Sequence, residues 1–211
     1  MLKRLFAMVL ACALFWSGIA LAESEFDISV FEDDPNYEVE FDEMDDTGTI
    51  RFAENSELTN TFLGTTDDED DGLVAGVADI RITENAPPVV RLSILYIAEN
   101  WAFIDEFIII AGSNRYTFAV DCEREVLDGG NIAEAFVIAL TDESIGLLED
   151  IANSASISFS YRLGGDADVD GDIYFNQDSI GYLYESYVDS GALENDFSLM
   201  KTVYSCEIKA M

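Results

Sequence analysis

The sequence predicts an α+β fold, a mostly antiparallel β-sheet or β-sandwich with two packed helices. Apolar and polar residues alternate with a period of two in many short segments, which is typical of strands with one buried face. Tight turns join most of these segments, so the long crossover connections of a parallel sheet are not expected. Two other segments carry apolar residues at spacings of three and four, which predicts helices that dock on the sheet.

The N-terminal part of the mature chain is acidic and predicts short strands. Alternation at residues 26–30 and 37–41 indicates two of them, and residues 49–52 indicate a third. The acidic run at 67–71 predicts a solvated loop. We therefore divide the chain into a signal peptide (1–22), acidic N-terminal strands and a loop (23–72), and a β-rich main domain closed by a disulfide (73–211).

Strands are predicted throughout the middle of the chain. The apolar run at 107–110 is continuous, which is typical of a buried central strand. Pro87 and Pro88 predict a loop, because proline lacks the backbone N–H that a strand donates. Glycine-containing turns are expected at 112–114 and 128–131. The remaining predicted strands are 73–82, 89–98, 115–120, 132–140 and 155–163.

Two helices are predicted in the C-terminal third of the chain. The first follows Thr141 or Asp142, either of which can cap its N-terminus. Its apolar residues recur at helical spacing between positions 145 and 152. The second helix has Asp178 as its predicted N-cap. It is expected to stop at Gly191, because glycine readily adopts the left-handed conformation that ends many helices.

The N-terminus has the pattern of a secretory signal peptide. Lys3 and Arg4 precede an apolar run at 5–22 that ends in Ala-Leu-Ala, and the chain turns acidic at Glu23. We therefore expect a periplasmic or secreted protein, cleaved near Ala22, whose mature chain has no membrane span.

Two alternatives to simple cleavage remain open. A small residue precedes Cys12, as in a lipoprotein signal, and acylation there would anchor the protein to a membrane. The apolar run also approaches the roughly 20 residues that span a bilayer, which would suit an uncleaved anchor.

The cysteines predict one disulfide. Removal of the signal peptide leaves Cys122 and Cys206, and export places them where disulfides form and persist. Cys206 lies in an alternating segment, 202–208, that predicts a final strand. The alternative is a pair of buried free thiols.

The composition excludes several classes of function. With 43 acidic and 10 basic residues, the formal net charge is −33, which keeps a protein soluble and repels nucleic acids and anionic membranes. Cationic ligands and divalent metals suit such a surface. The chain has no histidine, which excludes Ser-His-Asp hydrolysis and histidine-ligated metals.

One segment resembles a calcium-binding loop. Asp166, Asp168, Asp170 and Asp172 alternate, and glycine stands at the sixth position, as in the first half of an EF-hand loop. These four aspartates are the candidate metal ligands, and Ca²⁺ is the candidate cofactor. The twelfth position is Gln177 where an EF-hand has glutamate, so the alternatives are a calcium loop on another scaffold and a plain solvated loop.

Two triplets resemble the catalytic motif of aspartic proteases. They begin at Asp46 and Asp189, which would form the pair of carboxylates that activates water. Ser190-Gly191 is also explained as the end of a helix, and the mature chain is short for a two-lobed protease. A glycosidase would likewise need two carboxylates at a set separation.

The sequence therefore predicts an exported, non-catalytic binding or structural protein, with calcium as a candidate stabiliser. Its ligand is not identified by any motif. A carboxylate-based hydrolase, either aspartic protease-like or a glycosidase, is the alternative. Trp101 is expected to pack in the core, and anchoring of a ligand is its alternative role.

Overall fold

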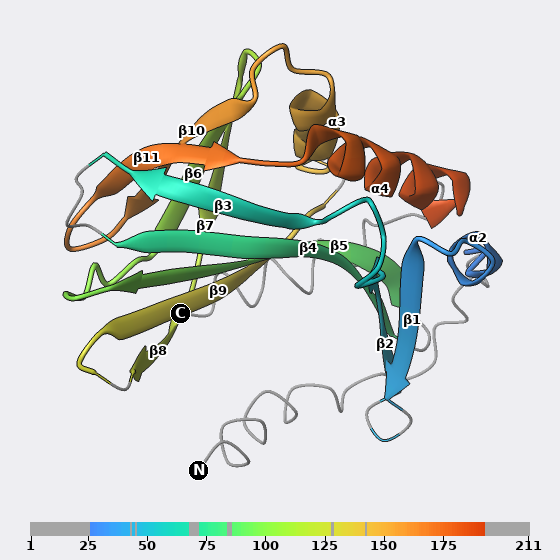
Figure 1. The fold of residues 1–211 in the computed structure, drawn as a ribbon, viewed down its shortest axis with the longest axis horizontal. Helices are drawn as coiled ribbons and strands as arrows, with labels where there is room; N and C mark the ends of the chain where they lie inside the picture. The colour runs from blue at the N-terminus through green and yellow to red at the C-terminus, as the bar shows by residue number, and fades with distance from the viewer. Residues whose placement is uncertain are drawn as a thin grey trace, which may run out of the picture.

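The computed structural model describes residues 26–192, except 43, 45, 68–71, 84–85, 128 and 142. Its strands form one sheet of eleven antiparallel strands, which curls into a half-barrel (Figure 1). The prediction of a β-rich α+β fold with antiparallel pairing is therefore confirmed. Within these residues the sheet is a single curled layer, and the second layer of a β-sandwich is not seen.

Nine strands form a continuous path in the order β7-β6-β10-β11-β3-β4-β5-β9-β8. The other two, β1 and β2, form a hairpin, and β2 also pairs with β4. The bounds are β1 (Tyr37–Asp42), β2 (Thr47–Phe52), β3 (Thr61–Thr66), β4 (Leu73–Thr83), β5 (Ala86–Ala98), β6 (Glu106–Ala111), β7 (Asn114–Ala119), β8 (Glu123–Val126), β9 (Ile132–Ala139), β10 (Ser158–Gly164) and β11 (Val169–Tyr174).

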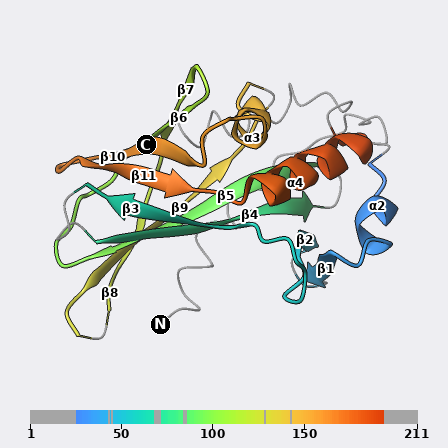
Figure 2. The same cartoon turned by 45° about the horizontal axis from the view of Figure 1, so that its top comes forward.

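Three described helices lie toward one end of the sheet. They are α2 (Ser29–Glu32), α3 (Gly146–Ala152) and α4 (Gln177–Asp189). Figures 1 and 2 both place α3 and α4 away from the β10–β11 turn, with α2 beside the β1–β2 hairpin. One end of the curled sheet is therefore covered by helices, whereas the other carries only loops.

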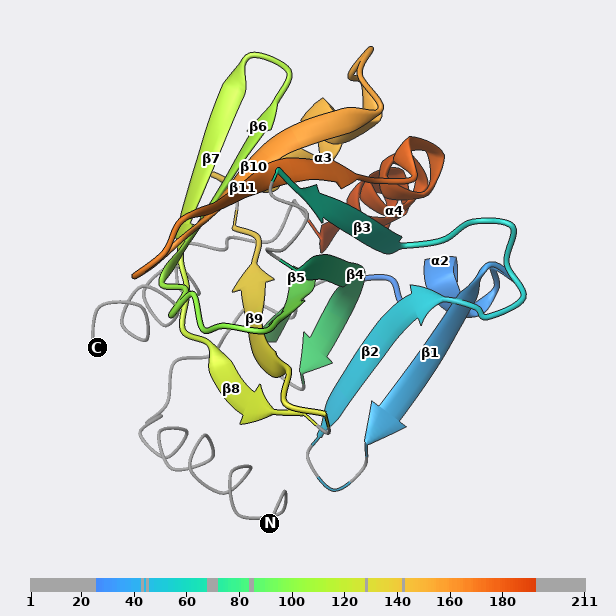
Figure 3. The same cartoon turned by 60° about the vertical axis from the view of Figure 1, so that its left-hand side comes forward.

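The curl of the sheet has two causes: two strands pair with the same edge of β4, and a short link joins β7 to β8. The same edge of β4 pairs with β3 through residues 74–77 and with β2 through residues 80–83. β7 and β8, at the two ends of the path, are consecutive in the chain, and only residues 120–122 separate them. The sheet therefore curves until its two ends are joined by three residues (Figure 3).

The hydrophobic core lies between the inner face of the sheet and the helices. Side chains from both belong to one cluster, and burying each large one contributes about 1.5–3 kcal/mol. The predicted helical face is confirmed, since Leu148 and Ile151 of α3 are fully shielded. Fully shielded members from the strands include Ile50, Phe62, Ile80, Leu92 and Ile109.

The structure corrects the prediction for residues 26–30. The segment begins helix α2, because the Asp27 carboxylate accepts a hydrogen bond from the Ser29 N–H at 3.0 Å and so starts a turn. The alternation of Phe26, Ile28 and Val30 therefore does not mark a strand, and the buried residue of α2 is Phe31.

Three further predictions are corrected. Pro87 and Pro88 lie within β5 rather than in a loop, near its start and opposite the end of β4. The N-cap of α4 is Asn176, whose side chain accepts from the Ser179 N–H at 3.0 Å, and not Asp178. The 107–110 segment lies in β6, which is next to the edge strand β7 rather than central in the sheet.

Candidate functional site

The Asp-rich segment lies in the hairpin formed by β10 and β11. Asp166 is in the turn, Asp168 directly precedes β11, and Asp170 and Asp172 lie on that strand. Because side chains alternate along a strand, Asp170 and Asp172 share one face of the sheet. The opposite positions, Val169, Gly171 and Ile173, are buried.

Arg162 of β10 neutralises part of the negative charge of these aspartates. Its Nε lies 2.6 Å from Asp170 Oδ1, and its Nη1 lies 3.4 Å from Asp168 Oδ2. The hydrogen bond from Arg162 lowers the pKa of the Asp170 carboxyl below its usual value. Ser160 donates to Asp172 at 3.3 Å. Among the described residues no group of carboxylates and thiols is arranged to hold a metal ion, and calcium binding stays a prediction.

Cys122 directly precedes β8 and is buried in the core cluster. Burial, followed by the nearby Glu134 carboxylate, raises the pKa of its thiol to about 12. Cys206 and the predicted strand at 202–208 lie outside the described residues. The Cys122–Cys206 disulfide therefore stays a prediction.

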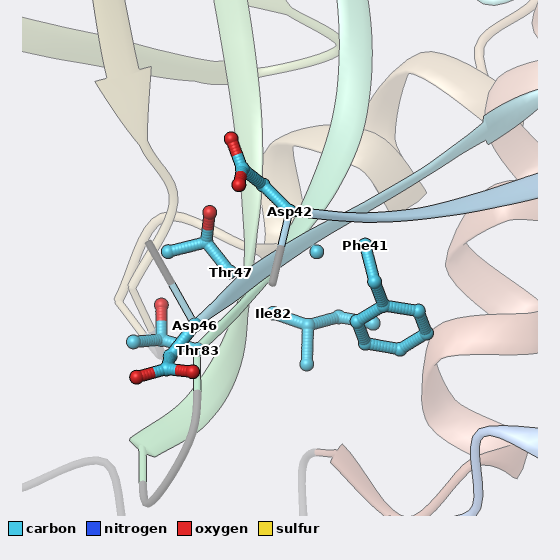
Figure 4. Close-up of a pocket in the computed structure, with 7 residues that line it drawn as sticks. Phe41, Asp42, Asp46, Thr47, Ile82 and Thr83 are labelled. Atoms are coloured by element: carbon cyan, nitrogen blue, oxygen red, sulfur yellow. The ribbon is translucent and has the colours of Figure 1, made fainter. Parts of the chain in front are cut away.

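The two protease-like triplets do not meet in a hollow that Asp46 lines. This open hollow, of about 430 Å³, lies where the β1–β2 turn meets β4. Asp42 also lines it, but Figure 4 shows the Asp42 and Asp46 carboxylates pointing away from each other. Asp189 is the last residue of α4 and is not part of its lining.

A second candidate site lies at the loop end of the sheet, opposite the helices. Residue 67 and the connections 99–105 and 165–168 meet there. The Ala167 N–H donates to the Ala102 carbonyl at 3.2 Å, and the Asp67 N–H donates to the Asp170 carbonyl at 2.8 Å. We call this region, residues 67, 99–106, 120–124 and 165–168, the loop-end surface.

The loop-end surface displays two aromatic side chains. The ring centroids of Trp101 and Phe103 are 6.0 Å apart. Trp101 is half-buried against the core, whereas 46% of Phe103 is exposed. The Arg124 guanidinium lies 5.5 Å from the centre of the Phe103 ring, within cation–π range. An exposed aromatic ring thus stands between a tryptophan and an arginine.

Phe103 is held in an unusual backbone conformation. Its φ angle is 53°, in the left-handed region that bulky side chains seldom adopt. The loop also packs closely against its neighbour, since a Cβ on Gly165 would lie only 2.5 Å from the Ala102 carbonyl oxygen. The loop and the β10–β11 turn therefore fix each other's position.

Glu134 of β9 holds the same loop from the core side. Its carboxylate is fully buried and accepts hydrogen bonds from three consecutive N–H groups, those of Ala102, Phe103 and Ile104, at 2.8, 2.9 and 3.0 Å. Arg124 Nε donates to it at 3.0 Å, and Arg124 Nη2 donates to the Ile104 carbonyl at 3.1 Å. Every partner of this buried charge is supplied by the protein, which makes its burial tolerable.

The rest of the loop-end surface is acidic. It carries Asp67, Glu99, Asp105, Glu106, Asp121, Glu123, Asp166 and Asp168. The arginines at this end of the described structure both have carboxylate partners, Arg124 with Glu134 and Arg162 with Asp170. The surface therefore combines exposed aromatic area with unbalanced negative charge.

Sequence reasoning missed Glu134, although a signal for it was present. In the strand at 132–140, Ile132, Phe136 and Ile138 share the inner face, and Glu134 falls on the same face. A charged residue in the buried register of a strand needs partners. No local sequence pattern, however, indicated that the backbone N–H groups of residues 102–104 are the hydrogen-bond donors to Glu134.

Comparison with known proteins gives no match to a family model, a curated protein or a solved structure. Across the described residues, no helix is both long and apolar enough to traverse a bilayer. The site must therefore be interpreted from its own geometry.

Proposed function

We propose that this chain is an exported, non-catalytic binding protein that takes a cationic ligand on the loop-end surface. The observation that carries the proposal is Phe103, an exposed aromatic ring on a left-handed residue that is fixed by a fully buried carboxylate. The ligand class that fits best is a peptide segment bearing arginine or lysine side chains.

The backbone of Phe103 supports a binding role. A bulky residue at positive φ costs about 1–3 kcal/mol, and such residues cluster where ligands bind. Three amides held by Glu134 stabilise this conformation, so the ring is presented in one orientation before a ligand arrives. A preorganised side chain loses little conformational freedom on binding.

The charge of the surface supports a cationic partner. Carboxylates surround the aromatic pair, and the formal net charge of −33 attracts cations over long distances. The faces of aromatic rings attract cations as well, by about 0.5–1 kcal/mol at exposed sites. Arg124 beside Phe103 is an intramolecular example of the same contact.

The described residues assemble no catalytic set, which supports the non-catalytic part of the proposal. The chain has no histidine. In the Asp46 hollow the two lining carboxylates point apart, unlike the adjacent carboxylates of an aspartic protease dyad (Figure 4).

Fluorescence titration tests the proposal directly. After cleavage near Ala22, Trp101 is the only tryptophan in the chain, so intrinsic fluorescence reports on the proposed site. The probe is a short arginine–glycine peptide, and the control is the same peptide with neutral citrulline in place of arginine. We expect saturable changes with the arginine peptide that weaken with salt. Equal responses to the two peptides would refute a cation-selective site.

A matched pair of variants locates the binding. Phe103→Asn removes the ring but keeps a residue that tolerates positive φ, and we expect the Kd to rise about two- to fivefold. Phe41→Asn removes another exposed phenylalanine, on β1 and far from the loop-end surface, and should leave the Kd unchanged. Unchanged binding in Phe103→Asn would place the ligand elsewhere. Export is tested separately by N-terminal sequencing of the periplasmic or secreted protein, which should begin near Glu23.

A further inference from the structure

The half-barrel has an opening between β7 and β9. β9 pairs with β5 along its whole length, but β8 covers only residues 132–135 of its other edge. Residues 136–139 of β9 have no second strand neighbour in the described part of the chain, and β7 pairs there only with β6. Two strand edges therefore remain available for pairing, which folded proteins usually cover or protect.

The opening leads directly to the core. Phe136 and Ile138 of β9 point inward and are buried, and Phe118 of β7 is half-buried against the same cluster. Phe107 of β6 touches both sides, with its ring centroid 5.9 Å from that of Phe136 and 6.2 Å from that of Phe118. The space between the two edges, which we call the gap, is therefore lined by apolar side chains that Phe107 links.

Cys122 stands at the closed end of this gap. It lies in the link where the chain leaves β7 and joins the edge of β9 as β8. Glu123 is paired with Ala135, so Cys122 lies next to the point at which β9 loses its second neighbour. Its side chain is buried and belongs to the core cluster, as do Phe136 and Ile138 of β9.

We propose that residues 202–208 fill this gap as a further strand, antiparallel to β9, and that Cys206 forms a disulfide with Cys122. In this segment Tyr204, Cys206 and Ile208 alternate with more polar residues. A strand presents such residues on one face, which here is the core face. The strand closes the half-barrel between β9 and β7, and the arrangement does not depend on the binding role of the loop-end surface.

The connection from α4 has the required reach and direction. Tyr187 near the end of α4 donates to the Pro88 carbonyl at 3.1 Å, and the Leu140 N–H, just after β9, donates to the Val90 carbonyl at 2.8 Å. The helix therefore ends near the last residue of β9. Residues 193–201 extend up to about 30 Å, so the strand enters the gap at that end and runs toward Cys122.

Charge complementarity supports the same occupant. The described part of the chain has no lysine, whereas the C-terminal segment carries Lys201 and Lys209. The strand and link beside the gap carry Asp121, Glu123 and Glu125. In a chain with a formal net charge of −33, the C-terminal segment is one of the few that can approach this edge without strong repulsion.

The disulfide forms by ordinary exchange. The Cys206 thiolate attacks a disulfide oxidant of the exported compartment, forming a mixed disulfide and releasing one thiol. The Cys122 sulfur then displaces the second thiol as its own proton leaves. The two cysteines lose two electrons and two protons in total, and the oxidant becomes a dithiol.

Peptide mapping without reductant tests the bond. The full exported protein should yield one linked peptide pair that contains Cys122 and Cys206, and reduction should separate it. Alkylatable free thiols in that protein, or a bond between two copies, would overturn the disulfide.

Hydrogen exchange tests the strand itself, independently of the bond. Ser205→Pro places a proline within the proposed strand, where it removes an N–H and opposes pairing. We expect exchange in residues 136–139 to rise at least tenfold. Asp196→Pro, in the connection from α4, is the matched control and should leave exchange there unchanged. Equal protection of 136–139 in both variants would refute the barrel-closing strand even if the disulfide exists.

Discussion

At the scale of single residues, the loop-end surface depends on one buried carboxylate. Phe103 is displayed at positive φ, and a lone strained residue would relax unless its surroundings held it. Glu134 holds it by accepting from three successive amides, and Arg124 balances the buried charge. Because the same carboxylate joins β9 to the 99–105 loop, it both fixes the loop-end surface and stabilises the fold.

Removing the negative charge of Glu134 should destabilise the folded protein. In Glu134→Gln, one side-chain oxygen becomes an NH₂ group that cannot accept from the backbone amides, and Arg124 loses its partner. We expect the free energy of unfolding to fall by about 3 kcal/mol, as when one partner of a buried ion pair is removed. Urea denaturation measures it. Glu125→Gln, an exposed change on β8, should cost less than about 0.5 kcal/mol, and similar losses in the two variants would contradict this account.

At the scale of elements, the β10–β11 hairpin differs from an EF-hand loop in how it presents its carboxylates. A calcium loop wraps so that its alternate carboxylates converge on the ion. Here the segment continues as a strand, and the side chains of Asp170 and Asp172 stand side by side on one face. Arg162 supplies the cation that this row of carboxylates needs.

Arg162 should therefore compete with calcium. In Arg162→Gln the carboxylates lose their internal cation, so we expect Ca²⁺ to raise the melting temperature by about 3 °C more than in the wild type. Thermal melts with Ca²⁺, and with Mg²⁺ at matched ionic strength, measure the calcium-specific part. Arg51→Gln, which removes an exposed ion pair on β2, is the control. Equal calcium effects in all three proteins would show that Arg162 does not occupy a cation site.

Strands with one buried face could be predicted from sequence because burial imposes a period of two. Residues 37–41 and 73–82 lie in the observed strands β1 and β4, and the predicted strand 115–120 matches β7 except for its last residue. β8 was missed because it is four residues long, largely charged and exposed on both faces. β3 was missed because Leu63 on its outer face is also apolar, which hides the alternation.

The candidate site was harder to predict, because its parts are distant in sequence. Trp101 was considered as a ligand anchor, but Phe103 and Glu134 are about 30 positions apart and meet only through the sheet. Residues 169–174 form β11, but the alternating aspartates in this segment were interpreted only as a calcium loop or a solvated loop. Local sequence patterns predict which side chains are buried. They give little information about which residues distant in sequence come into contact.

At the scale of the whole molecule, negative charge and buried phenols act in the same direction at high pH. Burial raises the pKa of the Tyr161 phenol above its ordinary value of 10.0, and burial followed by the Asp150 hydrogen bond raises that of Tyr116 to about 12. Each phenol that ionises adds a further negative charge to a chain with a formal net charge of −33. The folded state therefore favours neutral tyrosines.

This preference predicts a loss of stability in alkali. A tyrosine whose folded pKa is raised stabilises the protein fully below the unfolded pKa of about 10, because both states are then neutral. Above that pH the unfolded chain loses protons first, so the free energy of unfolding should fall as the pH rises from about 10 to about 12. Urea midpoints across this range measure the fall.

Two variants test the cause. In Tyr161→Phe the free energy of unfolding should fall less steeply with pH, although this variant loses the hydrogen bond to the Thr65 carbonyl. Tyr174→Phe, at an exposed site, should follow the wild type. If the free energy of unfolding fell equally with pH in all three proteins, ionisation of buried phenols would not be the cause of the alkaline loss of stability. Repulsion among the carboxylates would then be the cause, and added salt would reduce it.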